Sequence, residues 1–264
     1  MSADSNSKRT ITFLGASGGV GLAALSRALA AGHTCVALCR TPSKLTDRFP
    51  EDKHPNLIVM QGNAHDASAV ARCLVARERP ADTVVSSIGG VFKFSCMTID
   101  DPQVCQKGMA ALLEAIAQVR KERALTTEAA QWRPRIVVVS TCGISKAGRD
   151  FPLATLPIYK FMLRVPHEDK VEMERLLLEG AGAEAEDGKG KGTGKGYGYS
   201  YTIVRPSLLN DEAQPERAIR SGVDDKPPVG YAISRDDTGR WIFENLLDGE
   251  SREEYANKIV TITW

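Results

Sequence analysis

A glycine-rich run near the N-terminus has the spacing of a phosphate-binding loop. Its seven residues carry glycines at the first, fourth and seventh positions and are Gly15, Ala16, Ser17, Gly18, Gly19, Val20 and Gly21. Gly15 permits a tight turn, Gly18 lets the backbone approach a pyrophosphate, and Gly21 allows close helix packing. The N–H groups and positive dipole end of a following helix would complete a dinucleotide site.

The residues after the second apolar run bear on which dinucleotide would bind. Enzymes that use NAD usually place Asp or Glu there to hold the ribose hydroxyls. This chain has Cys39 followed by Arg40, with no carboxylate until Asp47. Arg40 can pair with a 2′-phosphate, assisted by Thr41 and Lys44. The missing carboxylate favours NADP (NADPH), and the alternative is that Arg40 is a solvated surface residue.

The loop needs a fold that places it at the end of a strand, and the sequence pattern supplies one. Apolar runs predict strands at 10–14, 34–38, 57–60, 82–87, 136–141, 201–204 and 258–263. Helical patterns alternate with them at 20–31, 43–48, 66–77, 102–123, 168–179 and 236–247. This alternation predicts an α/β fold: a single-domain, Rossmann-type, doubly wound parallel sheet with helices on both faces. Ligands of such sheets bind at the carboxyl ends of the strands.

Composition excludes several classes of partner. The 264 residues carry 34 basic and 33 acidic side chains, so no basic field is available for nucleic acid. No stretch approaches the ~20 apolar residues of a membrane span, and the N-terminus lacks a secretory pattern. Six scattered cysteines without a Cys-x-x-Cys pair predict no metal site. We therefore expect a cytoplasmic protein with neither nucleic-acid nor membrane partners.

One segment departs from the alternating pattern. Gly180 to Gly198 is rich in glycine, carries mixed charge and has almost no apolar residues. Such a segment cannot bury enough surface to offset its ordering entropy, which predicts a flexible surface loop. A lysine-bearing lid over the site is the alternative. Since the segment lies between a helix and a strand, we interpret it as an insertion in one domain spanning 1–264.

Six segments together resemble a known family. They are ITFLGASGGVG, ALCRTPSKL, VMQGNAHD, DTVVSSIGG, IVVVSTCGIS and YTIVRPSLL, in the order in which that family has them. The chain resembles the atypical short-chain dehydrogenase/reductases, in particular the NAD(P)H-binding, NmrA-like and biliverdin-reductase-B-like branches. It also looks like the small oxidoreductases of fungal polyketide pathways.

The resemblance implies further cofactor contacts. From adenine to nicotinamide, the residues are Asn63 and Ala64, then Ser87, Ile88 and Gly89, then Pro206 and Ser207. The family usually has Asp where Asn63 stands, so this contact is altered but still able to form a hydrogen bond.

The catalytic pattern of the larger family is incomplete here. That family reduces carbonyls with a Tyr-x-x-x-Lys pair and a Ser or Thr, the lysine orienting the ribose and lowering the tyrosine pKa. Lys170 matches the lysine, but Pro166 stands where the tyrosine should be. None of the six tyrosines has a lysine four residues later in the sequence. Thr141 matches the Ser/Thr position; capping backbone groups at a strand end is its alternative role.

Two residues could replace the missing tyrosine. His167 and Tyr159 lie in the region that faces substrate in the relatives. His167 is a candidate catalytic acid. The alternative is that it is a loop residue without a catalytic role. Tyr159 lies in an apolar stretch, where burial in the core or a pocket wall is the expected role. The surrounding segment, Phe151 to Val165, could be an apolar lid over the cleft or a dimer face.

Three functions are compatible with these features. The first is an NADPH-dependent reductase acting on a hydrophobic, aromatic or polyketide-like small molecule. Relatives similar to biliverdin reductase B work without the tyrosine, so its loss does not exclude reduction. The second is an isomerase, dehydratase or cyclase that keeps the fold, and the third is an NmrA-like regulator that senses the cofactor. The chain could be a monomer or a homodimer.

Overall fold

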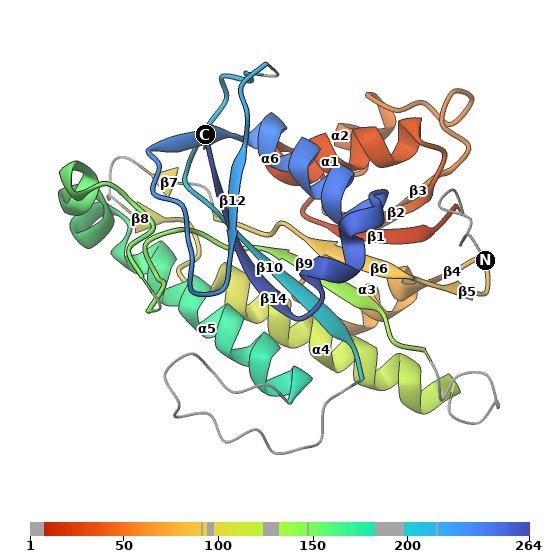
Figure 1. Ribbon diagram of the computed structural model, residues 1–264. Coiled ribbons are helices and arrows are strands. Elements are labelled where there is room, and N and C mark those ends of the chain that lie inside the picture. Colours follow the sequence, from red (N-terminus) through yellow and green to blue (C-terminus); the bar gives the residue numbers. More distant parts are fainter. Residues whose placement is uncertain are drawn as a thin grey trace.

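The central element of the molecule is an eight-stranded sheet (Figure 1). The computed structural model describes residues 8–90, 92–93, 98–123, 132–146, 148–182, 198–214 and 216–264. In spatial order the strands are β12 (Arg220–Val223), β14 (Lys258–Thr263), β10 (Ser200–Pro206), β9 (Arg135–Val139), β6 (Thr83–Ser86), β1 (Thr10–Leu14), β2 (Thr34–Cys39) and β3 (Leu57–Gln61). All pairings are parallel except that of β12 with β14.

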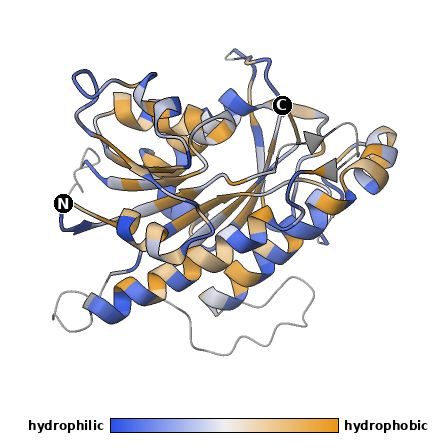
Figure 2. Cartoon of the chain, turned by 180° about the vertical axis from the view of Figure 1, so that it is seen from behind, coloured by the Kyte–Doolittle hydropathy of each residue, from blue (hydrophilic) through white to orange (hydrophobic). Residues whose placement is uncertain are grey.

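Helices cover both faces of this sheet. They are α1 (Gly19–Ala30), α2 (Ser43–Thr46) and α6 (Arg235–Ile242) on one face, and α3 (Ala67–Leu74), α4 (Val104–Arg123) and α5 (Arg164–Ala181) on the other. Two apolar clusters fill the space between sheet and helices. One contains Leu25 and Trp241, and the other contains Leu112 and Leu177. Figure 2 shows this arrangement as apolar strands beneath helices that are apolar on one side. The predicted doubly wound sheet is confirmed.

The strand order creates a switch point between β1 and β6. From β1 the chain builds outward through β2 and β3, then returns to β6 on the other side of β1. Leu14 and Ser86 are partners in register, so the loops that follow β1 and β6 leave the sheet side by side. Loops that diverge from such a point leave a crevice for ligand.

Several predicted boundaries are wrong, including the following three. Helix α3 ends at Leu74, because Arg77 and Glu78 have φ values of 50° and 63° and the chain turns back through the hairpin β4 (Val75–Ala76) and β5 (Arg79–Pro80). Strand β9 ends at Val139 rather than at Thr141. Helix α5 starts at Arg164 rather than at 168.

The early start of α5 changes the interpretation of His167. Pro166 lies in the first turn of the helix, where its missing N–H costs no helical hydrogen bond. The His167 N–H donates to the Leu163 carbonyl over 2.8 Å. His167 is therefore held by helical backbone, and its interpretation as a loop residue is wrong.

Several short strands lie outside the predicted set. They are the edge strand β12, the parallel pair β11 (Leu208–Asn210) and β13 (Ala232–Ser234), and the antiparallel pair β7 (Phe92–Lys93) and β8 (Thr98–Ile99). Of the predicted insertion 180–198, only its ends are described: α5 runs to Ala181, and Gly182 caps it with a φ of 76°. Residues 183–197 lie outside the described residues. In the part of the chain that is described, no helix has the length and apolarity of a membrane span.

Candidate active site

The glycine-rich loop packs tightly at two glycines and is open at a third. Gly15 has a φ of 88°, and a Cβ there would lie 2.8 Å from the Ser87 backbone. A Cβ on Gly21 would lie 2.2 Å from the Ser87 Oγ. At Gly18, in contrast, a Cβ would meet no atom within 4 Å. Side chains are thus excluded where the loop contacts Ser87, just beyond β6. The backbone at Gly18 is accessible.

The start of α1 has the features of an anion site. Gly18 is its N-cap and supplies no side-chain acceptor, and the first turn contains no acidic residue. Ser17, Gly18 and Gly19 are exposed. The first N–H groups of a helix lack helical acceptors and carry partial positive charge. The loop therefore fits a phosphate group.

The far end of the crevice carries the residues predicted to bind the adenosine portion. Arg40 and Thr41 are exposed directly after β2, and the Cys39 Sγ donates to the Thr41 carbonyl over 3.0 Å. Asn63 and Ala64 follow β3, the next strand of the sheet. The Asn63 Oδ1 accepts from the His65 N–H over 3.2 Å, which orients this amide.

A cavity of about 280 Å³ lies at the carboxyl ends of β6, β9 and β10. Six residues singled out from the sequence line it: Gly89, Thr141, His167, Lys170, Pro206 and Ser207. The rest of the wall is mostly apolar and includes Ile99, Leu163, Leu208 and Leu209. The fold therefore brings together, in one cavity, residues from four separate segments of the sequence.

Lys170 joins two of these strand ends. Its Nζ donates to the Val139 carbonyl over 2.7 Å and to the Ile88 carbonyl over 3.1 Å. These carbonyls lie at the end of β9 and just beyond β6. A lysine ammonium has three donors, and the third faces the Met173 Sδ, 4.0 Å from the Nζ, a weak acceptor that a ligand oxygen in the cavity could replace.

The hydroxyls of Thr141 and Ser207, in the wall of the cavity, already have partners. The Thr141 Oγ1 donates to the Cys142 carbonyl over 3.2 Å, which is the backbone-capping role. The Ser207 Oγ lies 2.8 Å from the Thr263 Oγ1. Each hydroxyl oxygen keeps acceptor capacity, but neither group is aligned as a free donor.

His167 differs, because a buried ring nitrogen has no partner. Its Nε2 finds no hydrogen-bond partner among the described residues. The side chain lines both the 280 Å³ cavity and a more open depression of about 420 Å³ beside it. Burial lowers the His167 pKa to about 4. The ring is therefore neutral at pH 7 and suited to a hydrogen bond rather than to a charge.

Tyr159 takes the wall position expected from its apolar surroundings. Its ring is 5% exposed and stacks on Phe151 with centroids 4.3 Å apart, and it lies 5.5 Å from the His167 ring. Burial raises the pKa of its hydroxyl. Tyr159 therefore has the buried position, in ring contact with His167, that its apolar surroundings predict. Leu153 and Phe161, from the same segment, are exposed.

The low pKa of His167 predicts a pH dependence of stability. The unfolded chain binds a proton at this ring near pH 6.5, the folded chain only near pH 4. Because the unfolded state binds more protons between these values, stability falls as the pH is lowered through this window. From pH 7 to 4.5, the free energy of unfolding should fall about 2 kcal/mol more for the wild type than for His167→Gln.

Urea unfolding of both proteins at each pH measures this difference. The pKa of His33 is also lowered by burial, and both proteins carry His33, so its contribution cancels. A difference that stays constant across the window would contradict the burial of His167.

A buried ion pair lies directly behind the cavity. The Arg205 guanidinium donates to both carboxylate oxygens of Glu174, over 3.1 Å and 2.5 Å, and the Ser140 hydroxyl donates to the same carboxylate. The side chains of Arg205 and Glu174 are 3% and 6% exposed. Glu174 is one turn after Lys170 on α5, while Ser140 and Arg205 precede Thr141 and Pro206. The pair therefore ties α5 to the ends of β9 and β10.

Asp169 performs a similar task for α4. Its carboxylate accepts from the N–H groups of Cys105 and Gln106 over 2.8 Å and 2.9 Å and is buried. A side chain of α5 thus caps the N-terminus of α4. The sequence interpretation missed both Asp169 and Glu174, although their position on the helix of Lys170 was available as a signal.

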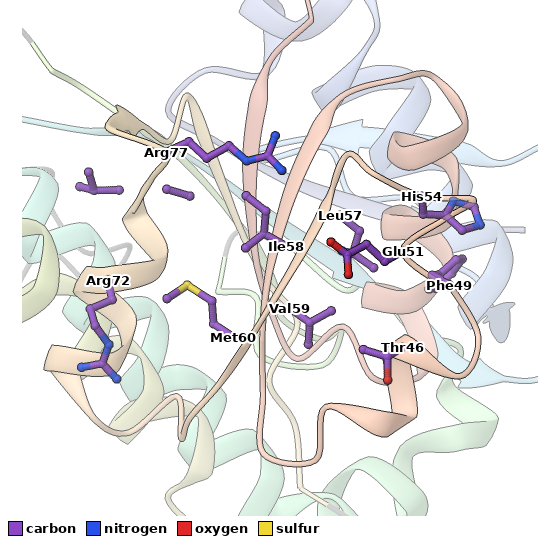
Figure 3. A pocket seen from close by; sticks show the side chains of 12 residues that line it. Thr46, Phe49, Glu51, His54, Leu57, Ile58, Val59, Met60, Arg72 and Arg77 are labelled. Atoms are coloured by element: carbon purple, nitrogen blue, oxygen red, sulfur yellow. The ribbon is translucent and has the colours of Figure 1, made fainter.

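A larger cavity, of about 590 Å³, lies elsewhere (Figure 3). It runs along the outer edge of β3, over Ile58 and Val59, with Arg72 and Arg77 at one side. None of the residues predicted to bind cofactor or substrate lines it. Its size reflects an uncovered sheet edge, whereas the smaller cavity combines polar groups with apolar walls, as ligand sites do. Within the described ranges, no cluster of His, Cys, Asp or Glu could hold a metal ion.

Comparisons with known proteins identify the family to which the chain belongs. Residues 15–249 match the model of a family described as NAD(P)H-binding. The reductase pytE of Aspergillus terreus is 41% identical over 277 residues, covering 98% of this chain and all of the relative. The oxidase pynE of Aspergillus niger is 30% identical over 292 residues, covering 97% and 99%.

Solved structures share the fold at low identity. A wide-type short-chain dehydrogenase/reductase from Veillonella parvula, solved with NADP, has a TM-score of 0.67 at 16% identity and covers 98% of this chain and 95% of its own. ChuY, an anaerobillin reductase from Escherichia coli O157:H7, has a TM-score of 0.58 at 19% identity, covering 96% of each chain. The relatives' names and the family match support an oxidoreductase. On the family match and the two Aspergillus relatives, this chain belongs to the NAD(P)H-binding family of Rossmann-fold proteins.

Proposed function

We propose that the chain is an NADPH-dependent reductase acting on a hydrophobic, aromatic or polyketide-like small molecule. The observation that carries the proposal is the cavity in which Lys170, His167 and Thr141 meet an apolar wall, at the same sheet edge as the glycine-rich loop. The names of the Aspergillus terreus and Aspergillus niger relatives, reductase and oxidase, support a redox reaction.

The residues present fit a nicotinamide dinucleotide along this edge. The accessible backbone of Gly18 and the start of α1 would hold the pyrophosphate, and Arg40 the 2′-phosphate. Arg40 and the Lys170 cavity would then hold the two ends of one extended ligand, with the glycine-rich loop at its middle. When bound, the reduced nicotinamide supplies a hydride.

The chain's own residues would bind and orient the substrate. The apolar side chains of Ile99, Leu163 and Leu209 exclude water from the cavity and suit an aromatic or aliphatic substrate. Lys170, held by two backbone carbonyls, would turn its third N–H from the weak Met173 Sδ acceptor to a ribose or substrate oxygen. The neutral His167 ring would donate a hydrogen bond to a substrate carbonyl rather than a proton, because its pKa is about 4.

Cofactor preference is expected to depend on Arg40. Replacing Arg40 with Asp removes the pairing with the 2′-phosphate and should weaken NADPH binding by about 1–3 kcal/mol, the scale of a charge-assisted hydrogen bond. NADH, which has no 2′-phosphate, should lose far less. Fluorescence titration of each cofactor measures both affinities.

Arg48→Asp is the matched control for this experiment. Arg48 is exposed beyond α2, and its substitution makes the same change in net charge. It should leave both affinities close to wild type. An equal loss for NADPH and NADH in Arg40→Asp would refute the assignment of Arg40.

The reaction class is tested by product mass. Incubation with NADPH and a panel of aromatic ketones and quinones should yield a product heavier by two hydrogens, with matching oxidation of the cofactor. A product of unchanged mass, or one that has lost water, would instead indicate the isomerase, dehydratase or cyclase class. Binding without turnover of any panel member would favour the regulatory class.

A further inference from the structure

An arginine from the C-terminal part of the chain lies against the glycine-rich loop. A Cβ on Gly19 would lie 3.3 Å from the Arg235 Cδ, so the arginine stem passes directly over this glycine. The same side chain lines the 280 Å³ cavity that contains Lys170 and Thr141. Arg235 is therefore placed between the start of α1 and the candidate catalytic residues.

Packing of α6 on α1 fixes this position. A Cβ on Gly239 would lie 2.4 Å from the Ala23 Cβ, so the two helices meet with almost no space between them. Asp236 accepts two hydrogen bonds from the Arg27 guanidinium, over 3.0 Å and 2.8 Å. The two helices lie side by side in Figure 1. Arg235, the first residue of α6, is thus carried on a rigid support.

The present partner of Arg235 is a weak one. Its guanidinium forms an ion pair with Asp211 over 2.8 Å, and the Asp211 side chain is 86% exposed. Exposed ion pairs contribute little to stability, because water and salt screen the attraction between the charges. A phosphate oxygen at the start of α1 would offer more charge and the bidentate geometry that a guanidinium prefers.

We propose that Arg235 binds the diphosphate of the dinucleotide, exchanging the Asp211 carboxylate for diphosphate oxygens when the cofactor enters. This inference rests on the proposed function, since it assumes a dinucleotide along the glycine-rich loop. It adds a further cation to the site, distinct from Arg40 and Lys170, and one that does not discriminate between NADPH and NADH. It also closes the crevice from the side of α6.

The test is a titration of Arg235→Met with three ligands. Methionine keeps an unbranched stem over Gly19 and removes the charge. Affinity for NADPH and for NADH should each fall roughly tenfold, the scale of one charge-assisted contact. Affinity for adenosine 2′-monophosphate, which has the 2′-phosphate but no diphosphate, should stay unchanged. Arg79→Met, which removes another exposed arginine paired with an aspartate, is the matched control and should bind all three ligands normally.

A second variant tests the exchange with Asp211. Asp211→Asn should tighten NADPH binding two- to threefold in the wild-type background, since the competing carboxylate is gone. It should have no effect when combined with Arg235→Met. Wild-type affinities in Arg235→Met would overturn the inference and leave the proposed function intact, as would an equal loss for adenosine 2′-monophosphate. Failure of the unaltered protein to bind either dinucleotide would overturn both.

Discussion

Replacing Glu174 with leucine is expected to lower the free energy of unfolding by about 3–5 kcal/mol, because the buried Arg205 loses its carboxylate partner. Both side chains are almost fully buried, so water cannot compensate for the uncovered charge. Urea denaturation followed by circular dichroism measures this loss through the midpoint and slope.

The double variant Glu174→Leu/Arg205→Met is the control for this prediction. Replacing both charges removes the unpaired cation, so the double variant should recover much of the lost stability. A single variant within about 0.5 kcal/mol of the wild type, the range of ordinary surface substitutions, would show that the pair does not hold α5 against β9 and β10.

Replacing Lys170 with methionine is expected to lower kcat by roughly 10²–10³-fold, the effect of removing one oriented donor from an active site. The Nζ is held by the carbonyls of Ile88 and Val139 and lies 4.0 Å from the weak acceptor Met173 Sδ, which its third N–H faces, so the position of the ammonium is fixed. Turnover of the ketone or quinone that the wild type reduces fastest provides the assay. The NADPH affinity of the same variant should also fall, because the lysine would contact the ribose.

Thr141→Ala is the comparison for Lys170→Met. The Thr141 hydroxyl already donates to the Cys142 carbonyl, so its loss should reduce kcat much less. Thermal melting of both variants separates a loss of chemistry from a loss of fold. Equal effects of the two substitutions, or none from either, would show that the site taken from the family pattern is wrong.

Local sequence predicts most of the fold here. The run from Thr10 to Gly21 contains a buried strand, a turn that requires a positive φ at Gly15, and the start of a helix, and all three are determined by neighbouring residues. The buried strand β9 is similarly apolar on both faces, as a central parallel strand requires. Such elements carry their own signal, and the alternation between them predicts the sheet.

The errors occur where tertiary contacts override local pattern. The helical pattern predicted a start at 168, after Pro166, but a proline in the first turn leaves the helix intact and α5 starts at Arg164. Strand β12 carries an exposed Arg220 and Ser221 and is paired only because β14 lies beside it. Neither case has a distinctive local pattern.

The candidate site divides in the same way. The sequence predicts the glycine-rich loop and Lys170, because fixed spacing and family resemblance identify them. Arg235 and Glu174 become visible only in three dimensions, since α6 must pack on α1, and α5 on β9 and β10, before either side chain has a partner. The Nε2 of His167, which has no hydrogen-bond partner among the described residues, likewise depends on the packing around it.

The measurement that most directly tests the central claim is a titration of the unaltered protein with NADPH and with NADH, followed by cofactor fluorescence. The account predicts one NADPH site per chain and an affinity for NADPH at least about tenfold above that for NADH, since one charge-assisted pair separates the two ligands. Binding of neither cofactor would contradict it.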